Sequence, residues 1–155
     1  MIQILTILHA LLAVGLLGAL THQAFSVARR KPASPAHTFI DRFRGVNSPT
    51  FTNVVVLLFV VTSIGGGLLY PRYRVDVRTT LEDLQLRAAN GVFEMKEHFA
   101  ALGVGLLPAY WLFWRPPLHV EYADTRKYLT WILALVTWWN FLVGEVLNNI
   151  KGLYP

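Results

Sequence analysis

The stretch that decides the fold is Ile2 to Val27, IQILTILHALLAVGLLGALTHQAFSV, which is apolar over most of its length. A helix needs about 20 apolar residues to cross the hydrocarbon core of a bilayer. This stretch therefore predicts a membrane-spanning helix. No Lys or Arg precedes it and a basic cluster follows it, so we expect a retained helix and not a cleaved signal peptide.

Three further apolar stretches are of similar length, and the composition agrees with a membrane protein. The chain of 155 residues is 54% hydrophobic and 15% charged, whereas a soluble domain carries about 25% charged residues. We therefore expect an all-α protein, a four-transmembrane-helix bundle forming a single integral-membrane domain over residues 1–155. The expected spans are 2–27, 52–70, 92–114 and 128–147.

The loop between the second and third spans predicts a short amphipathic surface helix over residues 80–89. Thr80 with an acidic residue three positions later resembles a capping box, and Asn90–Gly91 is typical of a helix end. Pro71 is expected to end the second span, because proline cannot continue the helical hydrogen-bond ladder.

The charged residues indicate a membrane surface as the partner. The net charge is +5, which fits cationic residues that flank helices and contact lipid headgroups, so we expect no nucleic acid. Absence of cysteine excludes disulfides, thiolate metal sites and c-type haem. The cluster Arg29–Arg30–Lys31 follows the first span and favours an inner position for that end. We expect both termini on the outer side of a bacterial-type inner membrane.

Ionisable side chains at membrane depth are costly and are therefore candidates for function. At about 1.5 Å per helical residue, His9 and His98 lie roughly 10 Å and roughly 9 Å below the outer surface. Three helices then place polar groups at similar depth on one side. The candidates are His9 and His22 in the first span, Glu94, Glu97 and His98 in the third, and Glu145 in the fourth.

The spacing on the third span defines the expected site more closely. Glu94 and His98 are four residues apart and share a helix face, on which Gly105 leaves room. One chemistry that fits is a single b-type haem with His9 and His98 as its iron ligands and Glu94 orienting His98. Glu97 and Glu145 would then add charge or act as a proton relay.

Two other interpretations remain open. His9, Glu94, His98 and Glu145 could instead hold a non-haem metal or relay protons. Alternatively, the polar residues of the third span simply lie in interfacial water, with Lys96 pairing with a carboxylate. His22 lies about 140° around the helix from His9. It is therefore expected to be a packed histidine, with a second haem site as the less favoured interpretation.

Two segments resemble the small four-helix b-type cytochromes of bacterial membranes: ILHALLAVGLLGALTH (7–22) and EHFAALGVGLL (97–107). The likeness covers two of the four spans. The chain lacks the four matched histidines of the two-haem pattern, so only His9 and His98 carry over as ligands. The resemblance implies haem b, a possible quinone, and electron transfer between the quinone pool and a partner protein.

We therefore expect an integral-membrane redox subunit, at most the electron-transfer subunit of an oxidoreductase, without a catalytic residue of its own. The alternative is a non-catalytic accessory subunit of a larger respiratory or photosynthetic membrane complex. Other membrane subunits or further copies of the chain are the expected protein partners in either case.

Overall fold

The apolar segments form long helices in the computed structural model, which describes residues 2–28, 46 and 48–153. This part of the chain contains helices and no strand, so the predicted all-α class is confirmed. The long helices are α1 (Ile2–Ala28), α3 (Pro49–Arg72), α5 (Arg87–Phe113) and α6 (Ala123–Leu153). The π-helical turn η2 (Tyr73–Val77) and α4 (Arg78–Asp83) follow α3, and η3 (Val120–Tyr122) precedes α6.

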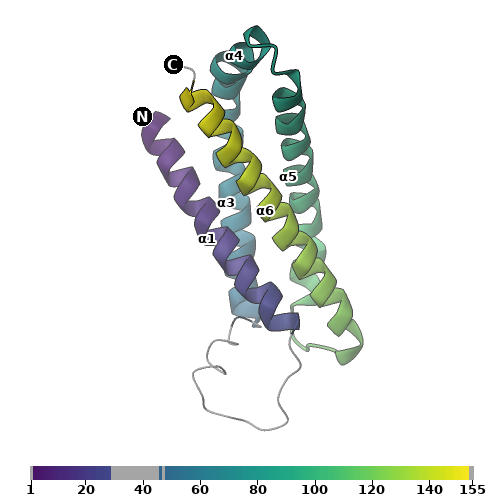
Figure 1. Ribbon diagram of the computed structural model, residues 1–155. Coiled ribbons are helices and arrows are strands. Elements are labelled where there is room, and N and C mark those ends of the chain that lie inside the picture. The colour runs from purple at the N-terminus through teal and green to yellow at the C-terminus, as the bar shows by residue number, and fades with distance from the viewer. Residues whose placement is uncertain (1, 29–45, 47, 154–155) are drawn as a thin grey trace.

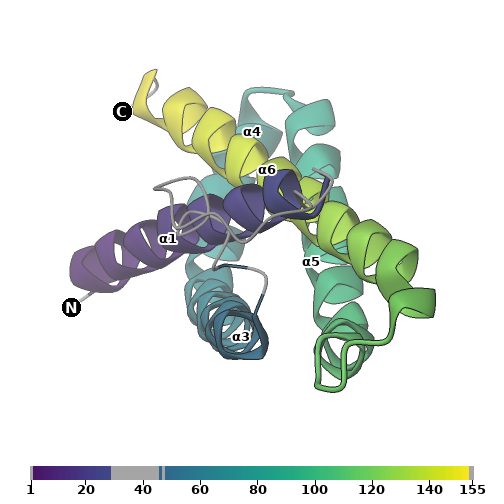
Figure 2. The same ribbon diagram turned by 90° about the horizontal axis from the view of Figure 1, so that it is seen from below.

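The long helices form a bundle in two layers. α1 and α6 lie in front of α3 and α5 in Figure 1, and the view from below in Figure 2 shows the same separation. α1 packs mainly on α3 and α6, and α5 packs mainly on the same two helices. α1 begins and α6 ends at the same end of the bundle (Figure 1).

Three helical stretches of the described residues are long and apolar enough to cross a membrane. They are Gln3–Ala28, Pro49–Asp83 and Val120–Asn149. α5 is not among them, because Glu94, Lys96 and Glu97 lie in its first half. The structure thus supports a membrane-associated helical bundle with three such helices, where four were predicted.

The connection between α3 and α5 differs from the prediction. Pro71 lies inside α3 and does not end it, and the chain stays helical through η2 into α4. The hydroxyl of Thr80 donates to the Asp76 carbonyl at 2.8 Å inside this helix, so Thr80 is not a cap. α4 ends at Asp83, and the remainder of the predicted surface helix 80–89 is divided between a turn and the start of α5.

Side-chain contacts with α5 explain why the chain continues past Pro71. The rings of Tyr73 and Phe93 stack with centroids 3.4 Å apart, and the Tyr73 hydroxyl donates to Asn90 Oδ1 at 2.9 Å. Arg78 lies 2.7 Å from Glu82 and 3.6 Å from Glu94 of α5. Tertiary packing therefore overrides the local preference of proline to end a helix.

We expect Tyr73→Leu to lower the free energy of unfolding by about 2 kcal/mol, because the substitution removes both the ring stack and the hydrogen bond. Tyr73→Phe keeps the stack and should cost about 1 kcal/mol. Denaturation in detergent, followed by circular dichroism, measures both. Tyr128→Leu is the control, since Tyr128 is 62% exposed. Equal stability of the Tyr73→Leu and Tyr128→Leu variants would contradict the packing role of Tyr73.

The apolar core occupies the half of the bundle in which α1 ends and α3 begins. It is built from Leu16, Leu20, Ala24, Val55, Phe59, Leu107, Tyr110, Trp114, Leu133, Ala134 and Val136. Gly103 of α5 allows the closest approach, because a Cβ atom there would lie 2.5 Å from Phe59 Cζ and 3.1 Å from Val136 Cγ1. The three helices α3, α5 and α6 therefore meet at Gly103.

A buried polar network joins α1, α3 and α5 at this end of the core. The Gln23 amide donates to the Val46 carbonyl at 3.2 Å and to Thr52 Oγ1 at 3.4 Å. The Tyr110 hydroxyl donates to Gln23 Oε1. Gln23 and Tyr110 are both fully buried, so these bonds hold the three helices in one register.

Candidate functional site

His9 lies on α1 with its ring packed against two glycines of α3. A Cβ atom on Gly65 would lie 3.1 Å from His9 Nδ1, and one on Gly66 would lie 3.4 Å from His9 Cε1. The glycine pair therefore provides the space that the imidazole fills. Small residues allow helices to pack closely, and here they do so around a polar ring.

The polar atoms around His9 are incompletely paired. Among the described residues, His9 Nδ1 and Thr62 Oγ1 are buried without a hydrogen-bond partner, although the Thr62 carbonyl lies near the ring. Buried polar atoms are hydrogen-bonded in most native structures, so an unpaired one marks a strained or functional position. His9 therefore keeps the capacity to bind or exchange a proton at Nδ1.

A close ion pair on α5 faces the same region. Lys96 Nζ lies 2.7 Å from Glu97 Oε1, and their side chains are 18% and 38% exposed. Lys96 reaches across to α6, where its Cε atom would lie 4.0 Å from a Cβ atom on Gly144. Both charges act electrostatically on His9. We call His9, Thr62, Lys96 and Glu97 the polar cluster; it draws on α1, α3 and α5.

The polar cluster has the chemistry of a proton site. Histidine is the side chain that changes charge most readily near neutral pH, and here the Lys96 charge opposes the imidazolium while the Glu97 charge favours it. Lys96 holds Glu97 by a charge-assisted bond, so movement of that bond alters the field at His9. These groups can therefore accept, hold and release one proton.

The stripe of Glu94, His98 and Gly105 points away from the cluster. Lys96 faces into the bundle, and His98 follows two residues later, about 200° around the helix, on the exposed side. Glu94 is 54% exposed and lies 3.6 Å from Arg78, not beside His98. A Cβ atom on Gly105 would have no neighbour within 4 Å. The structure does not bring His98 to His9.

The other expected site residues lie outside the cluster. Glu145 is exposed on α6, and its backbone carbonyl accepts a bond from Asn149 Nδ2 at 2.9 Å. His22 is half-buried on α1, in the half of the bundle that holds the apolar core. Of the three carboxylates predicted to relay protons, Glu97 is the one that the structure places near His9.

Lys96 is the site residue that the sequence analysis missed as a functional group. It precedes Gly103, Leu107 and Tyr110 by 7, 11 and 14 positions, the spacing of one helix face, and those three are buried. This spacing was the available signal for an inward-facing lysine. A charged residue on the same helix face as buried apolar residues is costly, so it is a candidate for function.

Haem ligation by His9 and His98 stays a prediction; the structure places His9 against the glycines of α3 and leaves His98 exposed on α5. Two histidines that share one haem iron must face each other across the macrocycle. His98 is exposed on the outward side of α5, and the space at Gly65–Gly66 is filled by the His9 ring itself. No group of three or more His, Cys, Asp or Glu within residues 2–28, 46 and 48–153 is placed to hold a metal ion.

Comparisons with protein-family models, curated proteins and solved structures find no match to this chain. The function is therefore argued from the polar cluster and its position in a membrane bundle.

Proposed function

We propose that this protein is an integral-membrane subunit whose polar cluster accepts and releases a proton. The observation that carries the proposal is the buried Nδ1 atom of His9, which has no hydrogen-bond partner among the described residues and feels the charges of the Lys96–Glu97 ion pair. Ionisable groups that face a bundle interior at membrane depth are typical of proton relays.

The proton step needs only groups of the cluster. A proton binds His9 and forms an imidazolium; because Glu97 already pairs with Lys96, the cluster then carries a net charge of +1. Release of the proton restores the neutral ring and the original Lys96–Glu97 pair. Oxidation or reduction of a quinone in a membrane releases or consumes protons, so such a site suits the redox subunit expected from the sequence.

The proposal includes a topology in which α5 is a fourth crossing. α5 packs along α3 and α6, and its charged first half is turned partly inward at Lys96. Arg115, Arg126 and Lys127 lie at the end opposite to the start of α1, which favours that end as the inner one. Both termini would then face outward from a bacterial-type inner membrane.

Titration of the histidines in lipid nanodiscs tests the proposal. The His9 signal is identified as the ¹⁵N-imidazole NMR signal that disappears in His9→Leu. We expect this signal to titrate reversibly in the wild type between pH 5 and 9, a range around the usual histidine pKa. Glu97→Gln should shift the midpoint of that signal, because it removes the negative charge that acts on His9. Glu145→Gln is the matched control and should leave the midpoint unchanged, since Glu145 is exposed on α6.

A His9 signal that does not change over this pH range would overturn the proposal. Equal midpoints in the wild type and the Glu97→Gln variant would also contradict it, because the carboxylate would then not act on His9.

One observation favours a second candidate function, that of an accessory subunit in a larger membrane complex. His98 is exposed on the outward side of α5, and an uncovered ionisable group is costly against lipid. Other membrane subunits would cover this side. Extraction in mild detergent should then recover a complex, and His98→Leu should disrupt it. Recovery of the wild-type chain alone would count against this function.

A further inference from the structure

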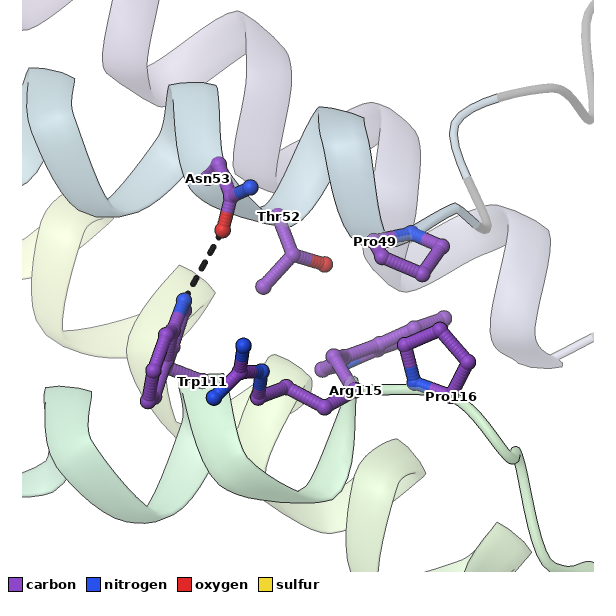
Figure 3. A pocket seen from close by; sticks show the side chains of 7 residues that line it. Pro49, Thr52, Asn53, Trp111, Arg115 and Pro116 are labelled. Atoms are coloured by element: carbon purple, nitrogen blue, oxygen red, sulfur yellow. Dashed lines mark hydrogen bonds between the residues drawn. The ribbon is translucent and has the colours of Figure 1, made fainter.

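A pocket of ≈ 150 Å³ lies between the start of α3 and the end of α5, in the half of the bundle opposite to the polar cluster. Figure 3 shows the Arg115 side chain running beneath Thr52 toward Trp111 and Asn53. The pocket is lined by Pro49, Thr52, Asn53, Trp111, Trp114, Arg115 and Pro116. It therefore combines one cation, two indoles and polar groups of α3.

Arg115 supplies a positive charge that no ion pair within the described residues neutralises. Its guanidinium carbon lies 4.1 Å from the centre of the Trp111 ring, which holds the side chain across the pocket. Among the described residues, no carboxylate forms an ion pair with Arg115. Guanidinium groups bind phosphate oxygens with two parallel hydrogen bonds, so the unpaired Arg115 favours a phosphate-bearing ligand.

Asn53 offers a second donor to the same space. Its Oδ1 atom accepts the Trp111 indole N–H at 2.8 Å, and this bond leaves the two Nδ2 hydrogens for a ligand. The amide orientation follows from the bond, because an indole N–H can only donate. Asn53 of α3 and Arg115, just past the end of α5, therefore present N–H groups to one pocket.

The pocket lies at the level where lipid headgroups meet the protein. The membrane-spanning stretch of α3 starts at Pro49, and Trp111 and Trp114 have the position of an interfacial aromatic belt. Val54 and Leu57 of α3 and Leu112 of α5 are exposed on the membrane side of the pocket, at 47%, 63% and 61%. Acyl chains can lie along these residues while the headgroup enters the pocket.

We propose that this pocket binds the phosphodiester headgroup of an anionic phospholipid, with Arg115 and Asn53 as its ligands. The apolar residues beside the pocket favour a lipid over free phosphate, because free phosphate would gain nothing from them. A net negative lipid is favoured over a zwitterionic one, because the described residues that line the pocket include no acidic group to receive a positive headgroup amine. The site is independent of the polar cluster.

Native mass spectrometry of the protein in mild detergent tests the site, with phosphatidylglycerol and phosphatidylcholine added in equal amounts. We expect the wild type to retain about tenfold more phosphatidylglycerol than phosphatidylcholine, a ratio typical of one added charge-assisted contact. Arg115→Gln should bring the ratio close to one. Arg74→Gln is the matched control, since Arg74 also stacks on an aromatic ring, 5.9 Å from the centre of Tyr70, at the other end of the bundle.

A second variant and a second ligand complete the test. Asn53→Leu should lower phosphatidylglycerol retention several-fold. This second variant tests the same pocket if the Arg115 variant fails to fold. Inorganic phosphate at millimolar concentration should neither displace the lipid nor raise the unfolding temperature. Unchanged lipid preference in Arg115→Gln, equal retention of both lipids by the wild type, or displacement by inorganic phosphate would overturn the proposal. His9→Leu should keep the lipid preference, which separates this site from the polar cluster.

Discussion

Replacement of Gly103 by leucine is expected to lower the free energy of unfolding by about 3 kcal/mol, the upper part of the range for overpacked cores. A Cβ atom at this position would lie 2.5 Å from Phe59 Cζ. Phe59 is only 4% exposed and Val136 only 6%, so neither side chain has free space into which it can move. The added side chain must push α5 away from α3 and α6.

Gly105→Leu is the matched control, because it places the same side chain in the same helix two residues away. A Cβ atom on Gly105 has no neighbour within 4 Å, and the position is exposed. This variant should remain within about 0.5 kcal/mol of the wild type. Denaturation in detergent, followed by circular dichroism and tryptophan fluorescence, measures both variants. If the two leucine variants unfold together, the contact of α3, α5 and α6 at Gly103 is not as described.

The second large effect is expected for Gln23→Leu, at about 2 kcal/mol of lost stability. The leucine leaves the Tyr110 hydroxyl without its acceptor and the Val46 carbonyl without its donor. Both residues are buried, so water cannot replace the lost bonds. Gln3→Leu is the control at the other end of α1, where the side chain is exposed, and should change stability by less than about 0.5 kcal/mol.

A double-mutant cycle separates the hydrogen bond from the shape of the side chains. Tyr110→Phe alone leaves Gln23 Oε1 without its donor, whereas the double variant removes both partners of that bond. We expect the double variant to be about 1 kcal/mol more stable than the sum of the single changes predicts. Strict additivity would show that Gln23 and Tyr110 do not interact in the membrane.

The helix positions could be predicted because they depend on local sequence. The run of residues 2–27 became α1 (Ile2–Ala28), and the Arg115–Pro116–Pro117 sequence lies just past the end of α5 at Phe113. The helix start at Pro49 is also local, since Ser48 caps it by accepting from the Phe51 amide at 3.2 Å. The continuation past Pro71 could not be predicted, because it depends on Tyr73 packing against a helix more than ten residues later.

The candidate site stays a prediction. The charge of Glu97 acts on His9, whereas Glu94 and His98, which were expected beside His9, are exposed on α5. The four-residue spacing shows that Glu94 and His98 share a face. It does not show which face turns inward.

The sequence by itself determined that this chain forms long apolar helices with ionisable residues in the first half of α5. Length and hydropathy are enough for that, because the bilayer requires backbone hydrogen bonds to be made within each helix. Only the tertiary structure decided how α5 is rotated. Gly103 fits against Phe59 and Val136, and this close packing turns Lys96 and Glu97 toward His9 and His98 away from it. The physical reason is that side-chain complementarity between helices, not polarity along one helix, selects the buried face.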